Sequence, residues 1–140
     1  MERSTAVQDA YARLCDAYAA ADPAVIEELL APDGCRVIGT DPAEWWGPDP
    51  GEVMDIHRRQ FAELGSLAIT PGDPECFSQG DVGWVADRPT LRLPDGRELR
   101  FRFTGVLSQR SNTWRFLQMH LSIGVPNQEA VGRELTTEVG

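Results

Sequence analysis

The nine residues Trp114–Ser122 have the sequence WRFLQMHLS. They lie in the run Trp114–Val125, whose aromatic and aliphatic residues are typical of a β-strand. The runs Val82–Leu93 and Arg97–Gln109 before it have the same character, and short links such as Pro94-Asp95-Gly96 separate the three at hairpin spacing. The sequence therefore predicts an antiparallel meander of three strands.

Three helices are expected before the meander. Thr5 and Gln8 have capping-box spacing, and apolar residues then recur at steps of three and four. The pairs Asp22-Pro23 and Asp49-Pro50 each combine a capping carboxylate with proline at the first helical position. The inward positions of the third helix are Val53, Ile56, His57, Gln60, Phe61 and Leu64.

Short strands, Leu67–Thr70 and Glu75–Ser78, lie between the helices and the meander. This order predicts an α+β fold, in which a cone-shaped, strongly curved antiparallel β-sheet is covered on one face by three N-terminal helices and encloses a cavity. The 140 residues fit one domain, which we expect at residues 1–126, followed by a polar C-terminal tail at 127–140.

Composition excludes several classes of function. The chain has 22 acidic and 13 basic residues, a formal charge of -9, which disfavours binding to nucleic acid or an anionic membrane. No apolar run approaches the ~20 residues that span a bilayer, and the N-terminus lacks the pattern of a signal peptide, so we expect a cytoplasmic protein.

Cysteine and motif patterns indicate neither metal nor cofactor. Cys15, Cys35 and Cys76 are odd in number and widely separated, which favours reduced, buried thiols over disulfides or a zinc site. The sequence has no phosphate-binding loop, dinucleotide fingerprint or nucleophile elbow. We therefore expect any reaction to be cofactor-free.

Alternation assigns each strand residue to a face of the sheet. Along Arg97–Gln109, one face carries Leu99, Phe101, Phe103 and Leu107, and the other carries Arg100, Arg102, Thr104 and Ser108. Along Trp114–Val125, the two sets are Trp114, Phe116, Gln118, His120, Ser122 and Arg115, Leu117, Met119, Leu121, Ile123. Both faces of this last strand are largely apolar, which predicts that one covers the helices and the other meets a second subunit in a homodimer.

Three segments resemble the nuclear-transport-factor-two-like superfamily and, within it, the SnoaL-like group of small bacterial proteins. They are Leu29–Asp33 at the end of the second helix, Ile38–Gly47 with its adjacent tryptophans, and the closing Trp114–Ser122. The resemblance covers nearly all of Ala6–Pro126 and implies the cone-shaped fold. The superfamily includes ketosteroid isomerases, polyketide cyclases, dehydratases, epoxide hydrolases, transport factors and a kinase association domain, so the scaffold alone does not fix the chemistry.

Two residues are the candidate catalytic groups. Asp41 stands before Pro42, just past the first strand, where the ketosteroid isomerases that the chain resembles carry a proton-shuttling carboxylate. At the mouth of an apolar cone it would be a better base, whereas the alternative is that it caps a turn. His120 is its candidate acid or base partner if its face lines the cavity. The alternatives are a buried neutral histidine or one at a dimer interface.

Further side chains are candidates for binding the substrate: Trp45, Trp46, His57, Tyr18, Arg102, Thr104 and Gln118. The tryptophans would form an apolar wall, Tyr18 would supply a phenol, and Arg102 with Thr104 would bind an oxygen if their face points inward. The alternatives are core packing for Tyr18 and His57 and a solvated face for Arg102. The stretch Phe103–Val106 lacks the carboxylic acid that the related isomerases carry as a second oxyanion donor.

The sequence thus favours a cofactor-independent acid/base isomerase or cyclase that acts on a small apolar carbonyl compound, with Asp41 as base and His120 as partner. The alternative is a non-catalytic ligand-binding or dimerisation module of the same fold.

Overall fold

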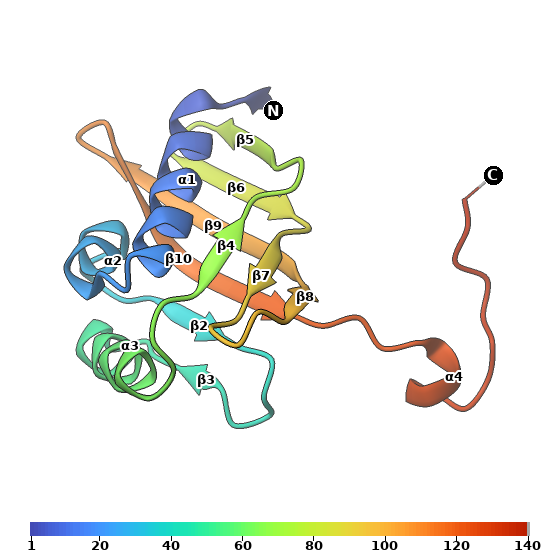
Figure 1. Ribbon diagram of the computed structural model, residues 1–140. Coiled ribbons are helices and arrows are strands. Elements are labelled where there is room, and N and C mark those ends of the chain that lie inside the picture. The colour runs from blue at the N-terminus through green and yellow to red at the C-terminus, as the bar shows by residue number, and fades with distance from the viewer. Residues whose placement is uncertain (140) are drawn as a thin grey trace.

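The computed structural model describes residues 1–139. Its helices are α1 (Thr5–Ala19), α2 (Pro23–Leu29), α3 (Pro50–Leu64) and α4 (Asn127–Ala130). Its strands are β1 (Glu2–Arg3), β2 (Arg36–Ile38), β3 (Trp45–Trp46), β4 (Ala68–Thr70), β5 (Glu75–Gln79), β6 (Val82–Asp87), β7 (Thr90–Arg92), β8 (Glu98–Arg100), β9 (Arg102–Arg110) and β10 (Thr113–Ser122). Helices α1, α2 and α3 lie together on one face of a bent sheet (Figure 1). The predicted α+β architecture is confirmed.

Two sheets share these strands. Within residues 1–139, one sheet has the order β1-β5-β6-β9-β10-β2-β3, and the other has the order β4-β7-β8. The meander β6, β9 and β10 is antiparallel as predicted. Strand β2, however, pairs in parallel with β10. The large sheet is therefore mixed, and not antiparallel throughout.

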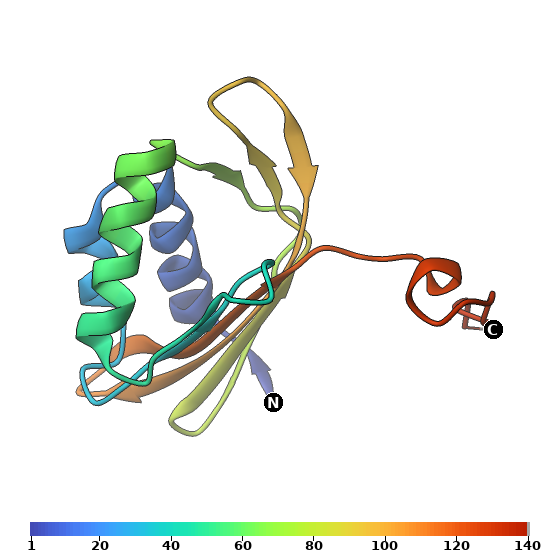
Figure 2. The same cartoon turned by 90° about the horizontal axis from the view of Figure 1, so that it is seen from below.

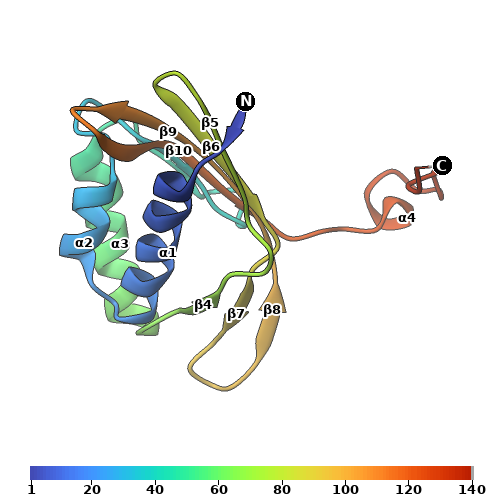
Figure 3. The ribbon, with the colours of Figure 1, turned by 90° about the horizontal axis from the view of Figure 1, so that it is seen from above.

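Each of the two long runs expected before the last strand is divided into two strands. The run Val82–Leu93 breaks at Pro89, whose nitrogen carries no hydrogen for a ladder bond. The run Arg97–Gln109 breaks opposite it at Phe101, whose backbone N–H donates to the Pro89 carbonyl at 3.1 Å. Beyond this point β7 and β8 turn away from the large sheet and form a second sheet, in which β7 pairs with β4 on one side and with β8 on the other (Figure 3). The break thus creates a second wall, opposite the main sheet.

Each of the three N-terminal helices is capped by the side chain of the residue just before its first turn. The Asp22 carboxylate accepts from the Val25 N–H, and that of Asp49 accepts from the Gly51 N–H. At α1 the cap is Ser4, whose hydroxyl accepts from the Val7 N–H at 3.1 Å, while Thr5 is the first helical residue. The capping box predicted at Thr5 is therefore wrong by one residue.

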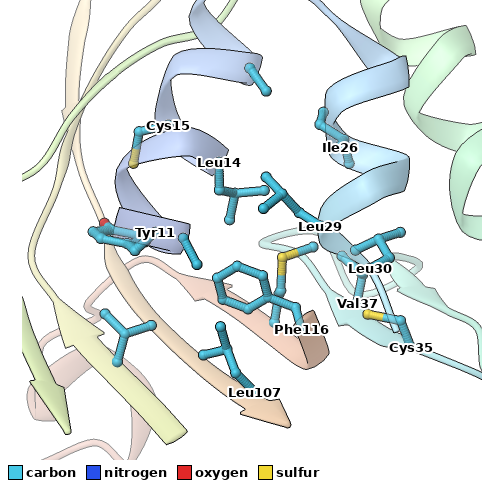
Figure 4. Packing of buried hydrophobic residues seen from close by; sticks show 14 of the residues in the cluster. Tyr11, Leu14, Cys15, Ile26, Leu29, Leu30, Cys35, Val37, Leu107 and Phe116 are labelled. Carbon is cyan, nitrogen blue, oxygen red and sulfur yellow. The ribbon is translucent and has the colours of Figure 1, made fainter. Parts of the chain in front are cut away.

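The core lies between the helices and the inner face of the large sheet. Phe116 of β10 is fully buried and lies beneath Leu14 of α1 and Leu29 of α2 (Figure 4). Phe116 pairs with Leu107 on β9, and its ring lies over Gly105, where a Cβ atom would come within 2.8 Å of the ring. The absence of a side chain at residue 105 therefore gives the phenylalanine its place against the sheet. All three cysteines are free and buried, as predicted.

Strand β10 contains a bulge, where the pairing with β9 shifts between Phe116 and Gln118. A bulge inserts an extra residue and reverses the alternation beyond it. Phe116 and Met119 are accordingly both buried, whereas Gln118 and His120 are exposed. The predicted division of this strand into faces holds before the bulge and is inverted after it.

The C-terminal tail leaves the body of the molecule after β10 and contains the four-residue helix α4 (Figure 1). The residues of this helix are exposed or partly exposed, and none is buried. Across residues 1–139, the structure contains no helix with the length and apolar character needed to cross a membrane.

Candidate functional site

A cavity of about 550 Å³ lies between the helices and the two sheets. This volume falls in the range of small-molecule sites in proteins. Its far wall comes from the three-stranded sheet and its flanks, which contribute Leu67, Ile69, Leu91, Leu93, Leu99 and Phe101. Figure 2 shows that the β7–β8 hairpin extends beside the ends of α1 and α3, away from the main sheet. The lining is mainly apolar, so each polar group in it stands out.

Tyr18 and His57 form a hydrogen-bonded pair in the cavity lining. Tyr18 lies in the last turn of α1, and His57 lies on the inward face of α3, where 5% of its surface is exposed. The Tyr18 Oη and His57 Nε2 atoms are 2.6 Å apart. The other ring nitrogen, Nδ1, donates to the Val53 carbonyl one turn earlier at 2.7 Å. The edge of the Trp46 ring approaches the His57 ring at 6.5 Å between centroids.

Burial keeps both members of this pair uncharged. Desolvation lowers the pKa of His57, opposed in part by the hydrogen bond to Val53, which favours the protonated ring. Desolvation likewise raises the pKa of Tyr18, with smaller contributions from the nearby Cys35 and Cys15. The site therefore holds a neutral imidazole against a neutral phenol.

The depressed pKa of His57 predicts that stability falls at mildly acidic pH. The unfolded chain binds a proton near the ordinary histidine value of 6.5, whereas the folded chain binds it only at lower pH. Stability is lost as pH falls from 6.5 toward the folded pKa, with a slope of up to ~1.4 kcal/mol per pH unit. We expect the stability difference between wild type and His57→Gln, measured by urea unfolding, to shrink over this interval.

His120→Gln is the matched control for that prediction, because His120 is exposed. Subtracting a variant's free energy of unfolding from that of wild type cancels the contributions of the carboxylates that both proteins share. A wild-type minus His57→Gln difference that stays constant between pH 7.5 and 5 would contradict a neutral buried His57.

A second polar pair, Tyr11 and Asp87, joins helix α1 to strand β6. Tyr11 is seven residues before Tyr18 and therefore shares its face of α1. Its hydroxyl donates to Asp87 Oδ2 at 2.7 Å, and that oxygen also accepts from the Gly72 N–H at 3.0 Å. Burial is the largest of several causes that raise the pKa of Tyr11. Asp87 is itself buried, and its Oδ1 atom has no hydrogen-bond partner.

The mouth of the cavity is acidic. Glu44 and Glu63 both line it. The Oε1 atom of Glu44 accepts from the Asp41 N–H at 2.8 Å, and its Oε2 atom accepts from the Gln60 side chain at 3.1 Å. Thr40 Oγ1 also lies 3.5 Å from Glu44 Oε1. Glu44 thus fixes the loop after β2 to helix α3 at the rim.

The structure places the two predicted catalytic residues outside the cavity. Asp41 is exposed, and its Oδ1 atom accepts from the Ala43 N–H at 2.8 Å, which is the turn-capping role weighed as the alternative. His120 is exposed on the outer face of the large sheet because the bulge in β10 turns it outward. The prediction that both project into the cavity is wrong.

Some of the predicted binding residues line the cavity, and the others lie outside it. Tyr18, Trp46 and His57 line the cavity. Four others are exposed outside the lining described for residues 1–139: Trp45, Arg102, Thr104 and Gln118. Adjacent residues of a strand face opposite ways, so Trp45 points outward, where the Arg36 guanidinium lies 5.5 Å from its ring centroid.

Sequence reasoning missed Glu44, which lines the cavity, and Asp87, which holds the hydroxyl of the lining residue Tyr11. Glu44 follows Asp41 by three residues in the loop, a spacing that signals side-chain capping of the turn. Asp87 gave a weaker signal, a carboxylate at an inward position just before the Arg88-Pro89 break. Among the described residues, no group of three or more His, Cys, Asp or Glu side chains is arranged to hold a metal ion.

A family model of the SnoaL-like domain matches residues 7–126. The chain belongs to this SnoaL-like family. The match ends where the polar tail begins and leaves out the short helix α4. No curated protein matches the chain.

Solved structures confirm the fold of this SnoaL-like protein. An NTF2-like protein of unknown function from Pseudomonas putida has 13% identity and a TM-score of 0.77, with 96% of this chain and 94% of that chain covered. A candidate ketosteroid isomerase from Shewanella frigidimarina has 16% identity and a TM-score of 0.71, with 85% and 96% covered. A candidate dehydratase of the NTF2-like family from Streptomyces avermitilis has 18% identity and a TM-score of 0.70, with 86% and 94% covered. At these identities the likeness establishes the fold and not an activity.

Proposed function

We propose that this SnoaL-like protein binds a small, mainly apolar molecule in the cavity between its helices and its two sheets. The observation that carries the proposal is the Tyr18–His57 pair, 2.6 Å apart, in the wall of an apolar cavity of about 550 Å³. Burying a polar pair costs free energy that an aliphatic core would not, so its place in a binding cavity favours a functional role.

The chemistry we propose is cofactor-independent acid/base isomerisation or cyclisation of an apolar carbonyl compound. The pair can act as a relay: a ligand proton passes to Tyr18 Oη as the tyrosine proton passes to His57 Nε2. The reverse transfer returns a proton to another ligand atom, so no proton is gained or lost. The isomerase and dehydratase activities named for two of the neighbouring structures support this class of reaction.

A non-catalytic binding module is the second candidate. Asp41, the carboxylate in the position of the proton-shuttling base, is exposed and engaged in its own turn. A cavity without that base can still hold a metabolite. An activity assay distinguishes the two functions. The catalytic function requires that wild type turns over a bound carbonyl compound and that His57→Gln still binds the compound but no longer turns it over.

A binding experiment with an uncharged probe tests the proposed function. We expect wild type to bind 2-methoxynaphthalene in isothermal titration calorimetry, because the probe is apolar and smaller than the cavity. Leu91→Trp, which adds an indole from the far wall, should weaken binding at least tenfold. Val131→Trp adds the same ring to the exposed tail and should leave binding unchanged.

Two results would contradict this function. One is a wild-type protein that binds none of a set of uncharged aromatic probes at millimolar concentration. The other is a Leu91→Trp variant that binds the probe as wild type does, because the probe would then lie elsewhere.

We also propose that the outer face of the large sheet meets a second copy of the chain. Val106 on β9 and Leu117 at the bulge are exposed there by 37% and 39%, beside the polar Gln118 and His120. Leu117→Arg is expected to convert the dimer to monomer in sedimentation equilibrium, because it would place a charge in the apolar part of the interface. Val131→Arg in the tail is the control, and a monomeric wild type at 50 μM would contradict the proposal.

A further inference from the structure

Two polar side chains in the cavity wall, Tyr11 and His57, direct a hydrogen into the protein. The Tyr11 hydroxyl donates to Asp87, and the His57 Nδ1–H donates to the Val53 carbonyl. A carbonyl oxygen only accepts, so in the neutral ring the proton resides on Nδ1. The Nε2 atom then has a lone pair and no hydrogen, and the Tyr18 hydroxyl must donate to it.

The direction of this hydrogen bond determines what Tyr18 offers to a ligand. Its one hydrogen is engaged by His57, and its oxygen keeps lone pairs that can accept. A ligand carbonyl also only accepts, so placing it against this oxygen would leave both groups without a hydrogen. A ligand hydroxyl would complete the chain from ligand to Tyr18 to His57 to Val53. Such chains strengthen each bond within them.

The charge at the cavity mouth disfavours an anionic ligand. Glu44 and Glu63 line the rim, and within residues 1–139 no arginine lines the cavity, while the sequence has no lysine. The nearby donors Gln60 Nε2 and Thr40 Oγ1 are directed to Glu44. The whole chain has a formal charge of -9. A ligand with a carboxylate or phosphate would find like charges and no cationic partner.

We propose that the cavity selects an uncharged molecule with a free hydroxyl, which donates to Tyr18 Oη, and rejects carboxylates and phosphates. This inference rests on the proposed function and specifies its substrate class. A carbonyl compound meets the requirement when it also carries a hydroxyl, as an enol or a hydroxyketone does. The hydroxyl binds as a donor at the pair, and the remainder of the molecule fills the apolar cavity.

Three probes of one shape test this inference by isothermal titration calorimetry at pH 7. 2-Naphthol has a hydroxyl donor, 2-methoxynaphthalene has the oxygen without the hydrogen, and 2-naphthoate has a negative charge. We expect 2-naphthol to bind about tenfold more tightly than the ether, as one hydrogen bond of ordinary strength provides. The carboxylate should bind more weakly than the ether.

Variants assign each preference to its residue. Tyr18→Phe removes the accepting oxygen and should reduce the naphthol-to-ether ratio to about one. Glu63→Gln on the exposed rim should improve binding of 2-naphthoate relative to the ether about threefold at low salt. The Glu63 variant preserves a test of charge selection even if Tyr18→Phe lowers the melting temperature.

The outcomes separate the inference from the function beneath it. Binding of the ether as tightly as the naphthol, or tighter binding of the carboxylate, overturns the inference and leaves the cavity as a binding site. A naphthol preference that persists in a folded Tyr18→Phe variant also overturns it. Failure of all three probes to bind overturns the proposed function, and the inference with it.

Discussion

Replacing Phe116 by alanine is expected to lower the free energy of unfolding by about 3–5 kcal/mol, the range for fully buried phenylalanine. Phe116 has no exposed surface and meets Phe103 edge-on at 6.3 Å between ring centroids. Collapse around the lost ring is limited, because the main chain of β10 is held between β9 and β2. The melting temperature should fall by about 10–15 °C. Calorimetry and urea unfolding measure both quantities.

Phe77→Ala is the matched control for this change. Phe77 lies near the sheet edge on β5, is partly exposed, and contacts Trp84 at 6.2 Å between centroids. Loss of the Phe77 ring should lower the free energy of unfolding by less than half as much as loss of the Phe116 ring, because water already contacts one side of Phe77. Equal costs at the two positions would mean that Phe116 is not the centre of the core.

Tyr11→Phe is expected to destabilise the protein by about 1–3 kcal/mol although it removes a single oxygen. The change leaves Asp87 Oδ2 with the Gly72 N–H as its remaining donor, in a side chain whose other oxygen already has none. A buried carboxylate that loses one of its two donors is left with less compensation for the cost of its desolvation. Urea unfolding of the variant measures this loss.

A double-mutant cycle with Asp87→Ala separates that hydrogen bond from the packing of the ring. Each single change leaves one buried polar group without its partner, whereas the double variant removes both. The double variant should therefore be more stable than the sum of the single losses implies, by about 1–2 kcal/mol. Strictly additive losses would contradict a coupled Tyr11–Asp87 pair.

The sequence predicted the helices and the meander well because local chemistry dominates there. Caps at Asp22 and Asp49 and the spacing of apolar residues are short-range signals, and the structure confirms them. The parallel pairing of β2 with β10 joins segments about 80 residues apart, and no local pattern encodes it. The position of Trp46 in the cavity wall, with Trp45 outward, depends on that pairing.

The sequence could not show where the candidate catalytic side chains point, because the orientation of each depends on one local feature of the backbone. A strand of strict alternation would put Gln118 and His120 on the side of Phe116, facing the cavity. The extra residue at Leu117 reverses that side, and neither Pro nor Gly marks its position. Asp41 was ambiguous because the same Asp-Pro pair suits a turn or a base, and the Ala43 N–H decides for the turn.

The separation of the two sheets has a consequence for how this protein can change over evolution or in the laboratory. Leu91 and Leu99 of the three-stranded sheet shape the cavity but lie outside the central apolar cluster around Phe116, whereas Ile69 of β4 packs against that cluster. Substitutions at Leu91 and Leu99 can alter which molecules fit the cavity while the protein keeps most of its free energy of unfolding. Part of the cavity wall can thus vary without disturbing the centre of the core, so libraries that diversify Leu91, Leu93 and Leu99 should yield many folded proteins with new ligand preferences.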